Sequence, residues 1–160
     1  MNMQQRSGIY SQANSGSVMT NVFSRRRAPV TDVVGDWRSA VLDRLEELIR
    51  LNVGWDGYDG LPVSLENATF ALRMLEVTCR EDTIAPQIVP GPSGELQIEW
   101  HTEFGDIELL VRGPYSVHAW RHLPSLSADG EEQELTNDFL VVAQWIEELS
   151  ELNIVISAAA

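Results

Sequence analysis

One short segment decides how the rest of this chain is arranged: Gly54-Trp55-Asp56-Gly57-Tyr58-Asp59-Gly60-Leu61-Pro62. It lies between two helical patterns. Glycine can adopt positive φ, and an aspartate side chain can accept a hydrogen bond from nearby backbone in a turn. Proline fixes φ where the next segment begins, and the two aromatic rings can bury surface that holds a corner down. The segment therefore predicts a rigid structural corner formed by Trp55, Asp56, Gly57, Tyr58, Asp59 and Pro62.

The charge of the chain is strongly negative and unevenly distributed. The 160 residues carry a net charge of −13. Residues 1–31 contain four arginines and no acid, whereas the remainder contains all 24 acidic residues and seven arginines, which gives +4 and −17. Binding to nucleic-acid phosphates needs a basic surface, so we expect no direct nucleic-acid binding by the folded part. The acidic part is instead compatible with a basic protein partner.

The length predicts a single domain with a tail at each end. Residues 1–30 are rich in Ser, Asn, Gln and Gly and are expected to form a basic flexible tail that contains Arg25, Arg26 and Arg27. These arginines could instead belong to an organelle transit peptide, fold back onto the acidic domain or hold an acidic partner. Residues 31–152 are expected to form one acidic α+β domain. Residues 153–160 are expected to form a C-terminal tail, whose stretch 153–157 is β-prone.

Cysteine content and hydropathy favour a cytoplasmic protein. Cys79 is the only cysteine, so no intrachain disulfide can form, which is consistent with a reducing compartment. Its place on the apolar stripe of a helix predicts a buried, unreactive thiol. No run of the sequence approaches the ~18 apolar residues that a membrane helix requires. We therefore expect no membrane association.

Two helical patterns flank the corner. The first runs from about Asp32 or Asp36 to Leu51, and the second from about Leu65 to Arg80 with Ser64 as its N-cap. The second helix carries two apolar stripes, so we expect other parts of the chain to cover it on two sides. These stripes are Leu65, Ala68, Leu72, Leu75 and Cys79, and Phe70, Met74 and Val77.

Beyond the second helix the sequence changes to the two-residue period of β-strands. Leu96, Ile98 and Trp100 alternate with polar residues, and the alternation returns at 107–111 and 115–121. Short links between these strands predict an antiparallel meander, to which 87–90 could add an edge strand. Residues 122–133 are expected to form a polar loop before a third helix at about 135–149. The predicted fold is α+β: two N-terminal helices, a three- to four-stranded antiparallel meander, and a C-terminal helix packed on the sheet.

The sequence contains no strong catalytic or metal-binding pattern. Asp56 and Asp59 fail the spacing of a calcium loop, because Tyr58 and Gly60 occupy positions that need oxygen ligands. Three histidines near strand ends could converge on a metal, but no short zinc spacing is present: His101, His118 and His122. Three glutamates could share an outward face for acid–base chemistry, although alternation places them in solvent: Glu95, Glu99 and Glu108. We therefore expect no catalytic residue, no bound metal and no cofactor.

Trp120 is the strongest candidate for an interface residue. It breaks the alternation set by Tyr115, Val117 and Ala119, so it is expected to face outward with His118. An exposed tryptophan on an acidic surface is the kind of side chain that anchors a protein interface. The alternative is that the tail or the third helix covers it. The residues expected to contact a partner are Trp120, His118, Glu99, Glu108, Arg25, Arg26 and Arg27.

Two segments together resemble a family of short bacterial and phage-borne proteins with a WDGY…P corner and a PxPxGxLQIEW strand. The first segment is Gly54-Trp55-Asp56-Gly57-Tyr58 with Pro62, and the second is Pro90-Gly91-Pro92-Ser93-Gly94-Glu95-Leu96-Gln97-Ile98-Glu99-Trp100. The resemblance covers about residues 37–120. It implies a cytoplasmic protein of bacterial or phage origin, but it implies no activity and transfers no functional residue.

The leading hypothesis from the sequence is an acidic protein-binding module. Such a module would inhibit or neutralise a basic partner, itself possibly a nucleic-acid-binding protein, in the manner of antitoxins, immunity proteins and channel-occupying inhibitors. One alternative is a small hydrolytic or metal-dependent enzyme that uses the strand carboxylates or the histidines. Another is a structural or assembly subunit. The sequence does not predict the oligomeric state.

Overall fold

The structure is a computed structural model that describes residues 36–125 and 129–157, the last five of them by their backbone alone. The predicted basic tail, with Arg25, Arg26 and Arg27, lies outside the described residues, as do residues 158–160. The first helix begins directly after Asp36. The carboxylate of Asp36 accepts a hydrogen bond from the N–H of Arg38 at 3.2 Å, which makes Asp36 the N-cap.

The described part contains three helices and five strands. They are α1 (Trp37–Ile49), α2 (Leu65–Thr78), β1 (Gln87–Pro90), β2 (Leu96–His101), β3 (Asp106–Gly113), β4 (Ser116–His122), β5 (Glu131–Leu135) and α3 (Leu140–Ser157). The strands form one antiparallel sheet in the order β1-β2-β3-β4-β5. The predicted α+β class is confirmed, but the meander has five strands instead of three or four.

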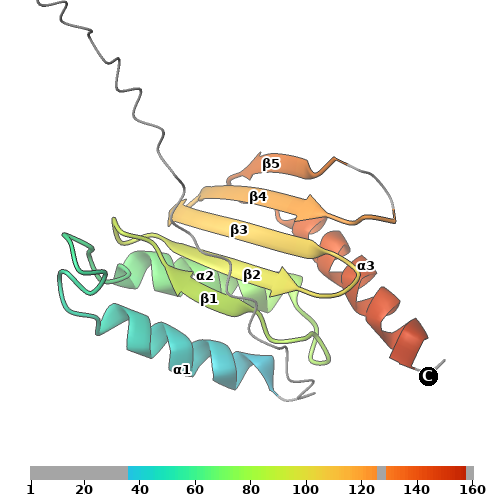
Figure 1. Cartoon of the computed structure of the whole chain (residues 1–160), viewed down its shortest axis with the longest axis horizontal. Coiled ribbons are helices and arrows are strands. Elements are labelled where there is room, and N and C mark those ends of the chain that lie inside the picture. Colours follow the sequence, from blue (N-terminus) through green and yellow to red (C-terminus); the bar gives the residue numbers. More distant parts are fainter. Residues whose placement is uncertain (1–35, 126–128, 158–160) are drawn as a thin grey trace, which may run out of the picture.

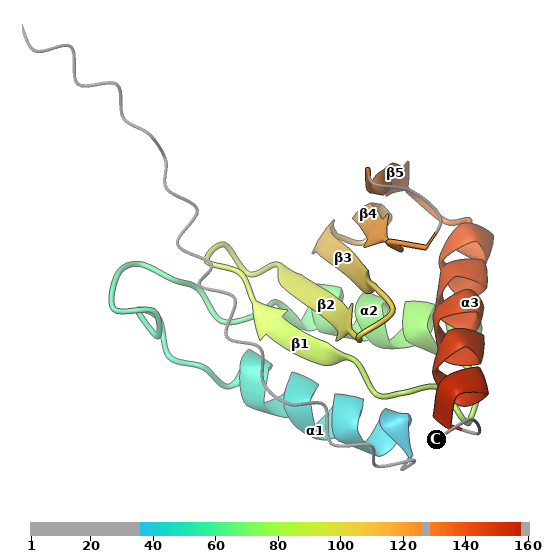
Figure 2. The ribbon, with the colours of Figure 1, turned by 45° about the vertical axis from the view of Figure 1, so that its right-hand side comes forward.

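The three helices cover one face of the sheet, and no helix formed by the described residues lies on the other face (Figure 1). Helix α1 lies along the β1 edge, α2 lies behind the middle strands, and α3 packs beside α2 on the same side (Figure 2). Side chains on the covered face are buried, while those that alternate with them are not. The buried strand residues include Leu96, Ile98, Trp100, Ile107, Leu109, Val111, Val117 and Ala119.

Three tryptophans belong to the core, as predicted. Trp37, Trp100 and Trp145 are buried. The indole N–H of Trp37 donates to the carbonyl of Arg80 at 2.8 Å, and that of Trp100 donates to the carbonyl of Ile84 at 2.8 Å. A buried indole N–H needs an acceptor. These two bonds therefore hold α1 and β2 against the link between α2 and β1.

Hydrogen bonds from its own backbone hold the corner together. The Asp56 carboxylate accepts from the N–H of Tyr58 at 2.9 Å and from that of Gly60 at 3.0 Å. The Gly54 N–H donates to the Gly60 carbonyl at 2.7 Å, which closes the loop. Gly54 and Gly57 have φ values of 82° and 85°, a region that favours glycine. The glycines and one aspartate therefore form the turn as the sequence predicts.

The two segments that carry the family resemblance contact each other. The N–H of Leu61 donates to the carbonyl of Pro92 at 2.8 Å, and the N–H of Ser64 donates to that of Gly94 at 3.0 Å. The Asn67 side chain on α2 donates to the same Gly94 carbonyl at 2.9 Å. The corner is thereby joined to the β1–β2 turn, which places the start of α2 against the sheet.

The corner differs from the prediction at two side chains. Tyr58 does not bury its ring, because the side chain is 85% exposed and only its backbone N–H supports the turn. Asp59 makes no hydrogen bond or ion pair with any described residue. Asp56 already fixes the turn through main-chain N–H groups, so neither side chain is needed for it. Trp55 is half-buried, and its indole N–H donates to the Leu61 carbonyl at 2.9 Å; Pro62 is half-buried next to it.

Replacing Asp56 by Asn is expected to destabilise the domain at neutral pH and to leave it nearly unchanged in acid. The hydrogen bond from Tyr58 lowers the pKa of Asp56 below its ordinary value of 3.8, with help from Gly60 and against a smaller effect of burial. A lowered pKa stabilises the folded state above the unfolded pKa, and this contribution is lost as pH falls through the folded pKa. Urea unfolding at several pH values measures the difference. Asp59→Asn is the control, and equal effects of the two substitutions at pH 7 would contradict the assignment.

The C-terminal third differs from the prediction in two places. Residues 131–133 were expected in a polar loop and Leu135 at the start of the third helix, but residues 131–135 form β5. Only Leu135 is buried there, so the strand shows no alternation. Helix α3 begins at Leu140 and continues through Ser157, although 153–157 was expected to be β-prone and part of a tail. Extending an existing helix needs no new nucleation step. The lower helix propensity of β-branched residues costs only about a few tenths of a kcal/mol per residue, so the helix can continue through this stretch.

Candidate functional site

The face of the sheet that carries no helix is the candidate site, and it is called the open face below. Five carboxylates belong to it: Glu99, Asp106, Glu108, Glu132 and Glu134. Strand register places them in rows that run across the sheet. One row is Glu99, Glu108, Trp120 and Glu132, and the next is Gln97, Leu110, His118 and Glu134. A third row, at the end of the sheet, is His101, Asp106 and His122.

The four predicted partner-binding residues within the described part come together on the open face. Trp120 and His118 point away from the helices, as the broken alternation predicts. Glu108 lies directly opposite Trp120 on the neighbouring strand, and Glu99 lies directly opposite Glu108. Glu95 does not join them, because it lies in the β1–β2 turn and accepts a hydrogen bond from the Ser93 N–H at 3.0 Å.

Trp120 is held in position at the centre of the open face. Its ring stacks on that of His122, with ring centroids 6.1 Å apart and planes at 27°. Gly130 lies so close that a Cβ there would come within 2.4 Å of the indole nitrogen. Beside the ring is a shallow hollow of about 290 Å³, lined with Leu110 and His118 among others. A half-buried, fixed aromatic ring next to an apolar side chain suits the centre of a protein contact.

Glu99 and Glu108 form a like-charged cross-strand pair. They are register partners on β2 and β3. Like charges directly opposite each other in a sheet are destabilising. Two neighbours offset part of this: the Gln97 amide donates to Glu108 at 3.1 Å, and His101 lies with Nε2 3.0 Å from a Glu99 oxygen. This pair places two carboxylates side by side in the middle of the open face.

His101 is held between two carboxylates. Its Nδ1 lies 2.8 Å from Asp106 and its Nε2 lies 3.0 Å from Glu99. Burial alone lowers the pKa of His101, but the hydrogen bonds and charges of Asp106 and Glu99 together outweigh it, so the pKa rises above 6.5. Both ring nitrogens are engaged. The geometry leaves neither nitrogen for a substrate proton or a metal ion.

Stability is expected to fall at alkaline pH through His101. A histidine whose folded pKa is raised stabilises the folded state fully below its unfolded pKa of about 6.5, and this contribution is lost as pH rises through the folded pKa. The stability difference between the natural chain and His101→Gln should therefore be largest below pH 6 and shrink as the solution becomes alkaline. NMR titration of the ring measures the pKa directly. Asp106→Asn should lower that pKa, and an unchanged midpoint would contradict the pairing.

Glu134 already has two partners on the sheet, Arg112 and His118. Arg112 contacts it through both terminal nitrogens at 3.2 Å, and Nδ1 of His118 lies 2.9 Å from it. Hydrogen bonds from Arg112 and then from His118 lower the pKa of Glu134. Glu134 therefore adds little net negative charge to the open face.

The remaining candidates for chemistry do not assemble into a site. His101 and His122 flank Asp106 in one row, whereas His118 lies in another. Within residues 36–125 and 129–157, no group of three or more His, Cys, Asp or Glu side chains could hold a metal ion. Burial raises the pKa of the Cys79 thiol to about 12, which keeps it protonated and unreactive at neutral pH.

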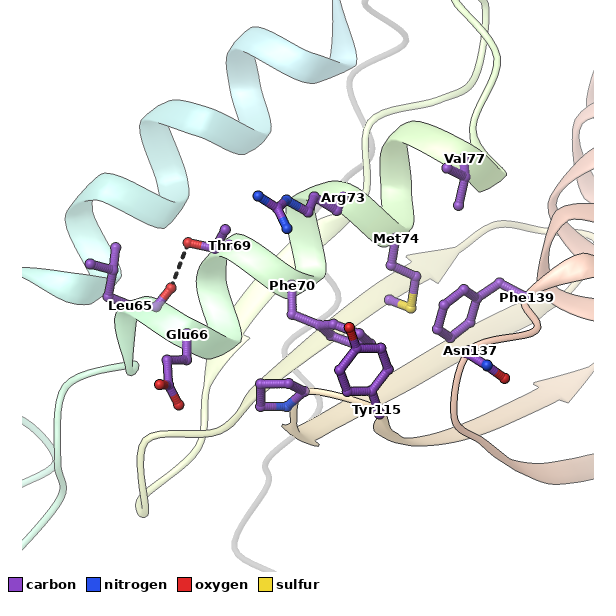
Figure 3. Close-up of a pocket in the computed structure, with 11 residues that line it drawn as sticks. Leu65, Glu66, Thr69, Phe70, Arg73, Met74, Val77, Tyr115, Asn137 and Phe139 are labelled. Atoms are coloured by element: carbon purple, nitrogen blue, oxygen red, sulfur yellow. Dashed lines mark hydrogen bonds between the residues drawn. The ribbon is translucent and has the colours of Figure 1, made fainter.

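Two features of the described structure were not predicted from the sequence. Arg121 sits on the helix side of β4 and ion-pairs with Glu131 at 3.0 Å and with Glu148 of α3. The second is an apolar groove beside α2 (Figure 3). The second apolar stripe of α2 lines that groove, but we expected other parts of the chain to cover this stripe. Val77, on that stripe, is instead 71% exposed.

None of the helices in the described part is both long and apolar enough to cross a membrane. Comparison of the chain with protein-family models, with curated proteins and with solved structures finds no match.

Proposed function

We propose that this chain is a protein-binding module that holds a basic protein on its open face and thereby inhibits or neutralises it. The single observation that carries the proposal is the arrangement of that face: five carboxylates surround a fixed tryptophan on a surface that no helix of the described part covers. Complementary charge of this kind steers association and selects the partner. The partner is a protein with a cluster of Arg or Lys side chains, of the type that antitoxins, immunity proteins and channel-occupying inhibitors bind.

The carboxylates of the open face and the Trp120 side chain have separate roles in the proposed binding. The carboxylates of Glu99, Asp106 and Glu108 attract cationic side chains and set the orientation of the partner. Trp120 and Leu110 supply apolar area at the centre, where most of the binding energy of an interface concentrates. Each role predicts a different response to mutation and to salt.

The alternative of an enzyme has less support. Carboxylates and a histidine do meet on the open face, but His101 is bonded on both nitrogens by Asp106 and Glu99. A general base needs a free nitrogen within reach of a substrate proton. The hollow beside Trp120 has a volume of about 290 Å³, just below the roughly 300–1,000 Å³ of most small-molecule sites. We place the module in the cytoplasm, in keeping with its lone, half-buried cysteine.

A salt-resolved capture experiment tests the proposal. The full chain is immobilised, exposed to extract of its own cells at about 0.05 M salt, and eluted at about 0.5 M salt, where surface charges are screened. A basic protein should elute from the immobilised natural chain at the high-salt step. The same protein should not be captured by the Trp120→Ser variant. The matched column of Tyr58→Ser removes an exposed aromatic ring elsewhere and should capture the protein normally. Capture that resists salt, or that survives Trp120→Ser, would contradict the proposal.

A further inference from the structure

A groove lies on the helix side of the molecule. It is a groove of about 660 Å³ between α2, the β3–β4 turn and the start of α3, and it shares no residue with the open face (Figure 3). Its size falls within the range of sites for small ligands. Its apolar lining is Leu65, Phe70, Met74, Val77, Pro114, Tyr115 and Phe139.

Aromatic rings form the wall of the groove. Phe70 of α2 meets Tyr115 edge to face, with ring centroids 5.4 Å apart, and meets Phe139 in the same way at 5.9 Å. Figure 3 shows these three rings gathered beside Met74. The rim is left uncovered, since Leu65 is 68% exposed at one end. Contiguous exposed apolar surface of this kind marks a binding site more often than a solvated face.

Tyr115 occupies an unusual backbone conformation. Its φ is 61°, and it is the only residue other than glycine with positive φ in the described part of the chain. A bulky side chain there is disfavoured, and Gly or Asn would fit the turn better. The strained conformation directs the ring against Phe70 while leaving it 65% exposed. Such strain is concentrated at functional positions.

Arg73 gives the groove a cation. Six of the seven arginines between residues 36 and 125 lie within 4 Å of a carboxylate: Arg38, Arg44, Arg50, Arg80, Arg112 and Arg121. Arg73 forms no ion pair with any described residue, although the domain has a large excess of acid. It lines the groove on α2, with its guanidinium toward Thr69 (Figure 3). A guanidinium on the rim of the groove that makes no ion pair with a described residue suits an anionic group.

We propose that this groove binds a small amphiphile with an aromatic or branched apolar body and one anionic group. The body lies against Phe70, Tyr115 and Phe139, and the anion meets Arg73. Glu66, which also lines the groove, lies seven residues before Arg73, about 10 Å along the helix. The two charges therefore orient the ligand, with its anion at the Arg73 end and away from Glu66. This site is independent of the partner proposed for the open face.

Two fluorescent probes that share one ring system test the site on the full chain. Anilinonaphthalene sulfonate has an aromatic body and one anion, and N-phenyl-1-naphthylamine has the body without the anion. Arg73→Gln should weaken the sulfonate probe about tenfold and change the neutral probe less than about twofold, because a lost bond to a charged group affects only the anion. Glu66→Gln should leave the sulfonate affinity equal or raise it. If Arg73→Gln weakened the binding of both probes equally, Arg73 would not recognise the anion, and the proposed anionic class of ligand would be wrong.

Tyr115→Asn tests whether an effect on probe binding comes from the groove itself or from a loss of stability. Asparagine tolerates positive φ, so the turn should be retained and the urea midpoint should not fall. Loss of the aromatic wall should weaken both probes about tenfold or more. Val77→Ser, at an exposed position of the rim, should weaken both in the same direction. Tyr58→Asn removes an exposed ring from the corner and should change neither. Probe binding that is absent from the natural chain, unaffected by Tyr115→Asn, or equally lost in Tyr58→Asn would overturn the site.

Discussion

Exchanging Glu99 and Glu108 together for lysine is expected to weaken binding of the basic partner at least about 100-fold, which corresponds to about 2.7 kcal/mol. The two carboxylates are register partners in the middle of the open face, next to Trp120. Reversal replaces attraction with juxtaposed positive charges, and like charges across an interface cost several kcal/mol. Most of the loss at low salt should appear in the association rate, because long-range steering is lost.

The control for this variant has the same net charge. Asp43→Lys on α1 combined with Asp59→Lys on the corner changes the charge equally, and neither aspartate belongs to the open face. Titration calorimetry with the captured partner at two salt concentrations compares the chains. The control should bind within about threefold of the natural chain at physiological salt, where charges more than about 8 Å away are screened. Equal losses in both variants would show that only net charge matters and would contradict a defined site.

Replacing Arg121 by Met is expected to lower the free energy of unfolding by about 2–3 kcal/mol. Arg121 is only 9% exposed, lies 4.9 Å from the ring centroid of Trp145, and joins Glu131 of β5 to Glu148 of α3. It therefore fixes both C-terminal elements to β4. The two glutamates are about half-exposed and can be solvated by water when the arginine is lost. The expected loss is for this reason smaller than for a fully buried ion pair.

Arg112→Met is the matched control for that variant. It makes the same substitution on the neighbouring strand, where Arg112 pairs with Glu134 in an exposed position. Exposed ion pairs contribute less than about 1 kcal/mol. Urea unfolding followed by tryptophan fluorescence gives both values. Equal losses in the two variants would contradict the role given to Arg121, as would an Arg121→Met chain as stable as the natural one.

The parts of the fold that follow from local patterns could be predicted. The alternation of Leu96, Ile98 and Trp100 sets which face of β2 is buried, because successive strand residues point to opposite faces. The Ser64 hydroxyl accepts from the Asn67 N–H at 3.1 Å, as expected of an N-cap. The same rule that assigns the core face also assigned Trp120 to the open face, since any residue out of phase with the core must point the other way.

The parts that depend on a distant partner could not be predicted. Strand β5 is almost entirely exposed and exists because β4 offers an unpaired edge, which leaves no hydrophobic period in its sequence. The role of Arg121 requires α3 to bring Trp145 and Glu148 to it. The groove beside α2 depends on the turn that carries Tyr115. The stripe of Phe70, Met74 and Val77 indicated apolar surface, but periodicity alone does not tell a packed face from one left open for a ligand.

The most direct test of the central claim is hydrogen exchange of the full chain with and without its captured partner. The account predicts that slowed exchange appears on β2, β3 and β4, with the indole N–H of Trp120 protected as well, and that α1 and the groove around Tyr115 are unaffected. Protection confined to the helices or to the groove, with the open face exchanging as in the free chain, would contradict it.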